Sequence, residues 1–149
     1  MSGILEGRVA IITGAGGGLG AAHAKVFASE GCAVVVNDIN TAAAQAVVDE
    51  ITKVGGKAVV NSSDITNYDD SLNAVRQAID SFGDLHIVVN NAGINRDRMF
   101  ASMTEQEWDA IMAVHLKGHF CISSHAVHFW RGQSKEGKPV NARIINTTS

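Results

Sequence analysis

The fold of this chain is decided by the stretch Thr13-Gly14-Ala15-Gly16-Gly17-Gly18-Leu19-Gly20. It follows the apolar run 9–12 and opens into a helical pattern that contains Ala22, Val26 and Phe27. A strand, a tight glycine turn and a helix start together form an anion site, because backbone N–H groups point outward, the helix dipole favours negative charge and missing side chains allow close approach. The same glycines could instead belong to a flexible linker.

A carboxylate further along the chain separates these two interpretations. Asp38 ends the next apolar run, 33–37, and stands 18 residues beyond Gly20. A glycine turn between a strand and a helix, with an acid about 20 residues on, is typical of a dinucleotide-binding βαβ unit. The sequence therefore predicts a dinucleotide site rather than a linker.

Short apolar runs alternate with amphipathic helical patterns along the rest of the chain. The expected strands are 8–13, 33–38, 57–61, 85–89 and 143–146, and the expected helices are 19–30, 41–54, 68–82 and 104–130. In the second helix, Ala43, Val47, Ile51 and Val54 are expected on one buried face. The last helix is expected to begin with a capping box over 104–107.

The alternation of elements predicts the fold class. The strands are continuous apolar runs, so both faces of the sheet should be covered. This predicts an α/β fold, a Rossmann-type doubly wound parallel sheet of about five strands in the order 3-2-1-4-5. Residues 1–149 are expected to form one dinucleotide-binding domain.

Composition excludes several classes of partner. The net charge is −3, so no broad basic field is present and no nucleic acid is expected as a partner. No uncharged apolar run approaches a membrane span, and no membrane is expected either. Cys32 and Cys121 give no disulfide framework and are expected to be small buried hydrophobes. We expect a cytoplasmic protein, with a peroxisomal or mitochondrial location left open.

Four motifs, in order along the chain, resemble the short-chain dehydrogenase/reductase family. They are the TGxxxGxG stretch 13–20, the pair Asp64-Ile65, the NNAG motif 90–93 and the strand 143–149 that ends at Ser149. Two branches are most similar, the (3R)-hydroxyacyl-CoA dehydrogenases and the 3-oxoacyl-acyl-carrier-protein reductases. Residues 91–100 with Trp108 resemble both branches, and the segment 114–118 favours the first.

The resemblance implies an NAD site. It places the pyrophosphate at the glycine turn, with Leu19 at the helix entrance; the glycines concerned are Gly14, Gly17, Gly18 and Gly20. Asp38 should accept hydrogen bonds from the adenosine ribose, and its charge would repel a 2′-phosphate, so NAD is favoured over NADP. Gly17 stands where NADP users of the family often carry an arginine. Asp38 could also be a turn residue that leads into the next helix.

The remaining cofactor contacts have plain structural alternatives. By resemblance, Asp64 and Ile65 frame the adenine, although Asp64 or Thr66 could instead cap the third helix. Asn90 should brace the sheet. Asn91 and Gly93 should lie beside the cofactor, although the two asparagines could be turn formers.

Two residues are candidates for catalysis. Ser149 aligns with the family serine that bonds the substrate oxygen, and otherwise it is a polar residue in a Thr-Thr-Ser stretch. His115 stands where most members have the asparagine of a proton relay, although the hydroxyacyl-CoA branch resembles this chain in having histidine. It could equally be a helix histidine satisfied by its neighbours. His115 and His119 have metal-ligand spacing but no third ligand in the motif, so no metal is expected.

The Tyr-x-x-x-Lys pair of the family is not found in this sequence. The only tyrosine, Tyr68, is expected on the wrong side of the fold. We therefore expect 1–149 to be the N-terminal part of a longer enzyme, with the last strand as an open edge. The resemblance implies an NAD-dependent oxidoreductase that interconverts a secondary alcohol and a ketone. A hydrophobic 3-hydroxyacyl thioester is the expected substrate, and the intact protein should be a homodimer or tetramer. A hydroxysteroid substrate and a non-catalytic dinucleotide-binding module are the alternatives.

Overall fold

The computed structural model describes residues 3–148. Five parallel strands form one sheet in the order β3-β2-β1-β4-β5. The strands are β1 (Val9–Thr13), β2 (Ala33–Asn37), β3 (Lys57–Asn61), β4 (Ile87–Asn90) and β5 (Arg143–Asn146). The predicted doubly wound parallel sheet and its strand order are confirmed.

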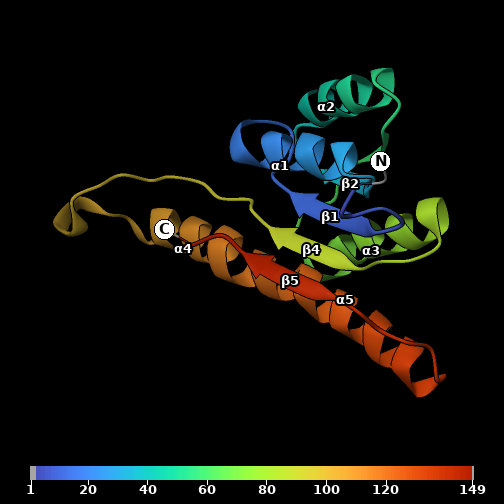
Figure 1. Cartoon of the computed structure of the whole chain (residues 1–149). Coiled ribbons are helices and arrows are strands. Elements are labelled where there is room, and N and C mark those ends of the chain that lie inside the picture. The colour runs from blue at the N-terminus through green and yellow to red at the C-terminus, as the bar shows by residue number, and fades with distance from the viewer. Residues whose placement is uncertain (1–2, 149) are drawn as a thin grey trace.

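Helices cover both faces of the sheet (Figure 1). Helices α1 (Gly18–Ser29) and α2 (Thr41–Lys53) lie on one face, and α3 (Tyr68–Phe82) lies on the other. Beside α3 runs a long helix made of α4 (Glu105–Met112), a π-helical turn (Ala113–Lys117) and α5 (Gly118–Lys135). A single 3-10 turn, η1 (Phe100–Ser102), interrupts the chain between β4 and α4. Among residues 3–148, no helix has both the length and the apolar character needed to cross a membrane.

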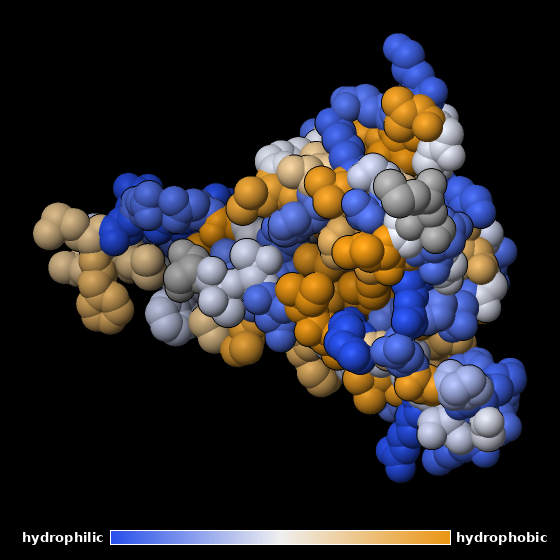
Figure 2. Space-filling view, viewed as in Figure 1, coloured by the Kyte–Doolittle hydropathy of each residue, from blue (hydrophilic) through white to orange (hydrophobic). Residues whose placement is uncertain are grey.

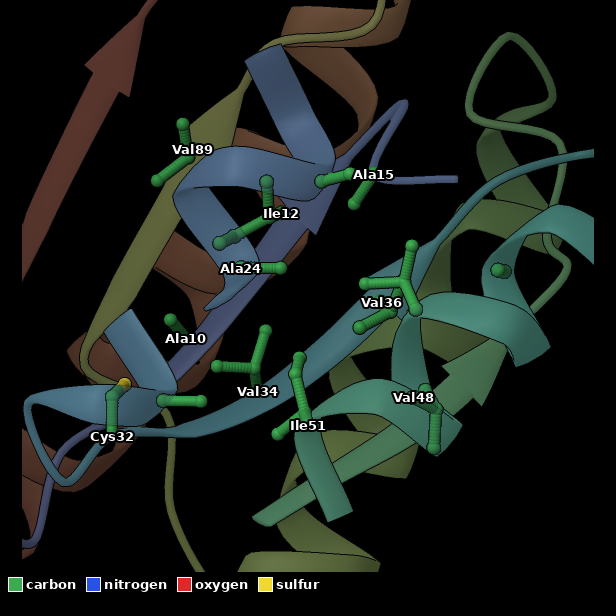
Figure 3. Packing of buried hydrophobic residues seen from close by; sticks show 14 of the residues in the cluster. Ala10, Ile12, Ala15, Ala24, Cys32, Val34, Val36, Val48, Ile51 and Val89 are labelled. Atoms are coloured by element: carbon green, nitrogen blue, oxygen red, sulfur yellow. The ribbon is translucent and has the colours of Figure 1, made fainter. Parts of the chain in front are cut away.

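The apolar strand sequences follow from this two-sided cover. Successive side chains of a strand point to opposite faces, so Ile11 and Ile12 enter different cores. Ile12 packs with Val34 and Val36 under α1 and α2 (Figure 3), whereas Ile11 packs with Ile122 of α5. Both faces need apolar residues, which explains why these strands do not alternate with polar positions.

The buried face of α1 is formed by its smallest residues. Ala22 and Val26 are exposed, and the buried residues are Gly20, Ala21, Ala24 and Ala28. Small side chains allow α1 to lie close against the sheet, so the face is set by size rather than by hydrophobicity. Among the larger side chains of this helix, Phe27 packs against the core at its edge, whereas Val26 is exposed.

Several predicted boundaries are also corrected. Helix α2 ends at Lys53, which leaves Val54 as the C-cap residue, 82% exposed rather than buried. Strand β4 is 87–90 rather than 85–89, although Leu85 is buried and its carbonyl oxygen accepts a hydrogen bond from Trp130 Nε1. The long helix reaches Lys135, and its predicted capping box at Thr104 and Glu107 is confirmed.

Strand β5 forms an exposed edge of the described sheet. It pairs only with β4 in the part of the chain that the structure describes, and all four of its residues are exposed. Figure 2 shows apolar surface over this strand, to which Ile144 and Ile145 contribute.

The two cysteines are buried and free, as predicted, and burial raises the pKa of the Cys32 thiol to about 12.

A pair of substitutions near the end of α2 tests this core. Ile51→Ala should lower the free energy of unfolding by about 2–5 kcal/mol, because Ile51 is 2% exposed and its loss leaves a cavity. Val54→Ala, three residues on, should change it by less than about 0.5 kcal/mol. Urea denaturation of both variants measures the difference, and equal losses would contradict an end of α2 at Lys53.

Candidate dinucleotide-binding cleft

A cleft of about 520 Å³ lies at the carboxyl ends of the strands. Its walls come from the loops after β1, β2, β3 and β4, together with Val114 of the π-helical turn. Its lining includes Gly14, Gly17, Leu19, Asp38, Asp64, Ile65, Asn91 and Gly93. In open α/β sheets this is where ligands bind, at the point where the strand order reverses. These eight predicted cofactor residues converge on one space, whereas Gly18, Gly20 and Asn90 do not line it.

The glycine loop is shaped by close backbone approach. A Cβ at Gly14 would lie 2.8 Å from the Ala92 Cα atom, and φ at Gly14 is +61°. A Cβ at Gly20 would lie 2.3 Å from the Gly14 carbonyl oxygen. Gly17, the N-cap of α1, makes no side-chain capping bond, so the start of the helix keeps backbone donors for an anion.

Asp38 is fixed beside this loop by two backbone donors. Its Oδ2 atom accepts a hydrogen bond from the Gly16 N–H at 3.0 Å, and its Oδ1 atom accepts one from the Asn40 N–H at 2.9 Å. A Cβ at Gly16 would lie 2.8 Å from Asp38 Oδ2. A side chain at residue 16 would therefore crowd the Asp38 carboxylate. Asp38 is thus a turn residue, as one of its two predicted roles requires, and it also lines the cleft.

Polar residues end every strand, and one of them, Asn37, lines the cleft. We call this set the polar row: Thr13, Asn37, Asn61, Asn90 and Asn146. The strand register pairs Thr13 with Asn37, Asn37 with Asn61, and Asn90 with Asn146. Asn37 Nδ2 donates to Asn61 Oδ1 at 2.8 Å, and Asn90 Nδ2 donates to Asn146 Oδ1 at the same distance. The row therefore adds side-chain bonds between neighbouring strand ends to the backbone hydrogen bonds of the sheet.

Thr13 fixes the loop after β4 to the glycine loop. Its Oγ1 atom accepts hydrogen bonds from the Asn91 and Ala92 N–H groups, both at 3.0 Å. Asn91 Nδ2 in turn donates to the Thr13 carbonyl oxygen at 3.1 Å. Asn90 is 1% exposed, and its Nδ2 also donates to Ser123 Oγ on α5. Neither Thr13 nor Gly16 was predicted as a site residue. For Thr13, the only signal in the sequence was a hydroxyl at the end of an otherwise apolar strand.

The pair Asp64-Ile65 is held between β3 and α5. Asp64 Oδ1 accepts hydrogen bonds from the N–H and the hydroxyl of Thr66, whereas the N-cap of α3 is Asn67. The alternative that Asp64 or Thr66 caps the helix is therefore wrong. Ile65 is buried, and a Cβ at Gly118 would lie 2.8 Å from its Cδ1 atom. Gly118 thus allows α5 to pack closely against the loop that carries Ile65.

His115 lies behind the wall formed by Gly93 and Ile94. Its Nε2 atom is 3.1 Å from the Ile94 backbone nitrogen and 2.8 Å from the Ile94 carbonyl oxygen. His119, one turn further along the helix, has its pKa lowered by burial and by the charge of His115. No group of three potential metal ligands occurs among residues 3–148.

The other candidate residues are placed as follows. Ser149 lies outside the described residues. Tyr68 begins α3, and its ring stacks on Phe120 and contacts His125 of α5. Tyr68 does not line the cleft.

Comparisons with known proteins agree with this geometry. The profile of the short chain dehydrogenase family matches residues 8–149. Hydroxyacyl-CoA dehydrogenase ChsB1 of Mycobacterium tuberculosis is 46% identical over 152 residues, covering 97% of this chain and 48% of that protein. Peroxisomal multifunctional enzyme type 2 of Mus musculus is 41% identical over 153 residues, covering 97% of this chain and 20% of that protein.

A solved structure gives the same result. The crystal structure of a short chain dehydrogenase from Mycobacterium avium superposes with a TM-score of 0.97 at 53% identity, covering 99% of this chain and 56% of that one. The chain belongs to the short chain dehydrogenase family. It spans about half the length of ChsB1 and of the Mycobacterium avium protein.

Two substitutions test the contact that joins the two loops. Thr13→Val keeps the shape of the side chain but leaves the Asn91 and Ala92 N–H groups without their acceptor. We expect the free energy of unfolding to fall by about 1–3 kcal/mol. Thr13→Ser keeps the hydroxyl and should lose much less stability. Thermal unfolding of both variants provides the measurement, and a Val variant as stable as the Ser variant would refute the contact.

Proposed function

We propose that this chain is the dinucleotide-binding domain of an NAD-dependent oxidoreductase that interconverts a secondary alcohol and a ketone. The substrate we propose is a 3-hydroxyacyl thioester. The observation that carries the proposal is the cleft, in which the open start of α1 and the fixed carboxylate of Asp38 line one space.

The chemistry of the cleft suits NAD. The free backbone donors at the start of α1 fit a pyrophosphate, and the close packing at Gly14 and Gly20 lets it approach the backbone. Asp38 offers carboxylate oxygens to ribose hydroxyls and opposes a 2′-phosphate. A Cβ at Gly17 would meet no atom within 4 Å, so the loop has room for a side chain at this position. Because the residue is glycine rather than arginine, it offers no positive charge to the 2′-phosphate of NADP. When bound, the nicotinamide would supply the hydride chemistry.

The choice of substrate rests on the relatives. One is named a hydroxyacyl-CoA dehydrogenase, and a second, from Thauera aromatica, is named a dehydrogenase of a hydroxylated succinyl-CoA. Both names describe a hydroxyacyl thioester of coenzyme A. We propose the same class here and assign Ser149 and His115 to the catalytic half of the site, as predicted from the sequence.

We also propose that the protein is a homo-oligomer. The π-helical turn and α5 expose Leu116, Phe120 and Val127, which are 61%, 59% and 46% exposed. A row of large apolar side chains on one helix suits a protein contact better than water. Light scattering of the purified protein gives its mass in solution. A cytoplasmic location remains a prediction, and some relatives are named peroxisomal.

The activity is tested by the appearance of NADH. The intact protein should reduce NAD with a (R)-3-hydroxyacyl thioester, with NADP giving a much smaller rate. A sterol alcohol serves as the comparison substrate and should be oxidised more slowly. If no NADH appears with either thioesters or sterols, the proposed activity is wrong. NAD binding without turnover would favour a non-catalytic binding module instead.

Asp38→Asn tests the choice of cofactor. The amide keeps an oxygen for the loop but loses the charge, so NAD should bind about 10- to 100-fold more weakly, from the loss of about 1.5–3 kcal/mol of charged hydrogen bonding. The ratio of the NAD affinity to the NADP affinity should become smaller. Isothermal titration calorimetry with both cofactors gives the affinities. Asp80→Asn, on the exposed side of α3, is the matched control and should change neither affinity; unchanged NAD binding by Asp38→Asn would rule out the ribose contact.

A further inference from the structure

Three side-chain amides form a hydrogen-bonded series that runs from α3 to the cleft. Gln77 of α3 donates from Nε2 to the Val60 carbonyl oxygen at 2.6 Å, and its Oε1 atom accepts from Asn61 Nδ2 at 2.8 Å. Asn61 Oδ1 in turn accepts from Asn37 Nδ2 at 2.8 Å. We call Gln77, Asn61 and Asn37 the amide series. Asn37 lines the cleft, whereas Gln77 and Asn61 do not.

Backbone groups fix the direction in which each amide of the series points. A carbonyl oxygen can only accept, so the Val60 carbonyl requires Gln77 to present Nε2, which leaves Oε1 for Asn61. A backbone N–H can only donate, and the Ser63 N–H lies 3.1 Å from Asn61 Oδ1. The Ser63 carbonyl oxygen lies 3.0 Å from Asn37 Nδ2. The oxygen and nitrogen ends of all three amides therefore follow from their partners.

This arrangement leaves one polar atom of Asn37 unused. Its Nδ2 atom has two N–H bonds, and these go to Asn61 Oδ1 and to the Ser63 carbonyl oxygen. Among residues 3–148 no group donates to its Oδ1 atom, and this atom is not fully buried even though Asn37 as a whole is only 2% exposed. Because Asn37 lines the cleft, Oδ1 is the atom of this side chain that a bound ligand can reach.

The surroundings of this oxygen favour a ligand group that donates a hydrogen bond. Asp38 follows Asn37 directly and Asp64 follows Ser63, and both carboxylates line the same cleft. All three side chains offer oxygen atoms, so a ligand here has to bring N–H or O–H groups. We infer that Asn37 Oδ1 binds a hydrogen-bond donor of the adenosine half of the cofactor, and that Asn61 is the positioning residue for this contact. The inference rests on the proposed function.

Adenosine has two kinds of donor that suit such an oxygen, the amino group of adenine and the 2′-hydroxyl group of the ribose. Two analogues of NAD separate these sources. In nicotinamide hypoxanthine dinucleotide, an oxygen atom replaces the amino group. In the 2′-deoxyadenosine analogue, the hydroxyl group is missing. Each analogue removes one donor and leaves the rest of the dinucleotide in place.

Calorimetric titration of the intact protein with NAD and both analogues tests the contact. Asn37→Ala should reduce the ratio of NAD affinity to the affinity for one analogue by about 3- to 10-fold, the equivalent of one neutral hydrogen bond. The analogue concerned identifies the donor. Asn73→Ala, on the exposed side of α3, is the matched control and should change neither ratio. If Asn37→Ala leaves both ratios unchanged, the inference is overturned.

Two variants at residue 61 test the positioning role. Asn61→Leu removes the acceptor of Asn37 Nδ2, so the Asn37 amide is no longer held and the same ratio should fall. Asn61→Asp keeps an oxygen for Asn37 Nδ2 and for the Ser63 N–H, and it should restore the ratio. A loss of stability alone would weaken NAD and the analogue alike. An unchanged ratio in Asn61→Leu, or an equal fall in Asn61→Asp, would reject the role of Asn61.

The orientation of Asn37 is tested without cofactor by hydrogen exchange of the side-chain amides in nitrogen-15-labelled protein. Both Asn37 Nδ2 protons are hydrogen-bonded, so they should exchange with deuterated water more slowly than those of the exposed Asn73. Exchange at the same rate would overturn the inference. If exchange is slow but the unsubstituted protein binds no dinucleotide, the proposed function is wrong and the adenosine contact is wrong with it. If NAD binds and neither ratio depends on Asn37, only the contact is wrong.

Discussion

The approach of α1 to the ends of β1 and β4 is the constraint on which the rest of this structure depends. A Cβ at Gly20 would lie 2.3 Å from the Gly14 carbonyl oxygen and 2.6 Å from Asn91 Nδ2. Any side chain there would push the helix away from the sheet. The alanines at 21, 24 and 28 would then lose their contact with the strands. The start of the helix would also turn away from the cleft, so a single missing side chain joins the core to the site.

The sequence predicts the fold well because its apolar runs reflect a simple physical requirement. A sheet covered on both faces needs apolar residues at successive positions, and Ile11 and Ile12 show this directly. The details that could not be predicted depend on distances in space. The buried face of α1 is formed by small side chains, which a hydropathy pattern does not single out. Val54 lies just beyond the last turn of α2. The π-helical turn has no recognised sequence signal. Asp38 was predicted from its spacing, whereas its bond to Gly16 becomes visible only when the loop is folded.

The polar row shows how a cleft can be formed at the end of an apolar sheet. Where the strands separate, backbone groups lose their ladder partners and would be left without hydrogen bonds in a buried place. Side chains take over that role: Thr13 Oγ1 accepts hydrogen bonds from the Asn91 and Ala92 N–H groups, and Asn37 Nδ2 donates to the Ser63 carbonyl oxygen. These bonds hold the loops apart at fixed spacing. The cleft is thus formed before any ligand binds, which lowers the entropy cost of binding.

The charges around the cleft are arranged so that a simple anion is a poor ligand. The start of α1 attracts negative charge, but Asp38 and Asp64 line the same space and repel it. Coulombic energy falls with distance. An anion therefore gains binding energy only if its charge lies at the start of α1 and the parts of it that lie near the two carboxylates are neutral hydroxyls or rings. A dinucleotide has this distribution, with its pyrophosphate between two riboses. If the ribose binds beside Asp38, as proposed above, a phosphate added to it would place charge against charge. Under that proposal, the carboxylate that orders the glycine loop also narrows the choice of ligand.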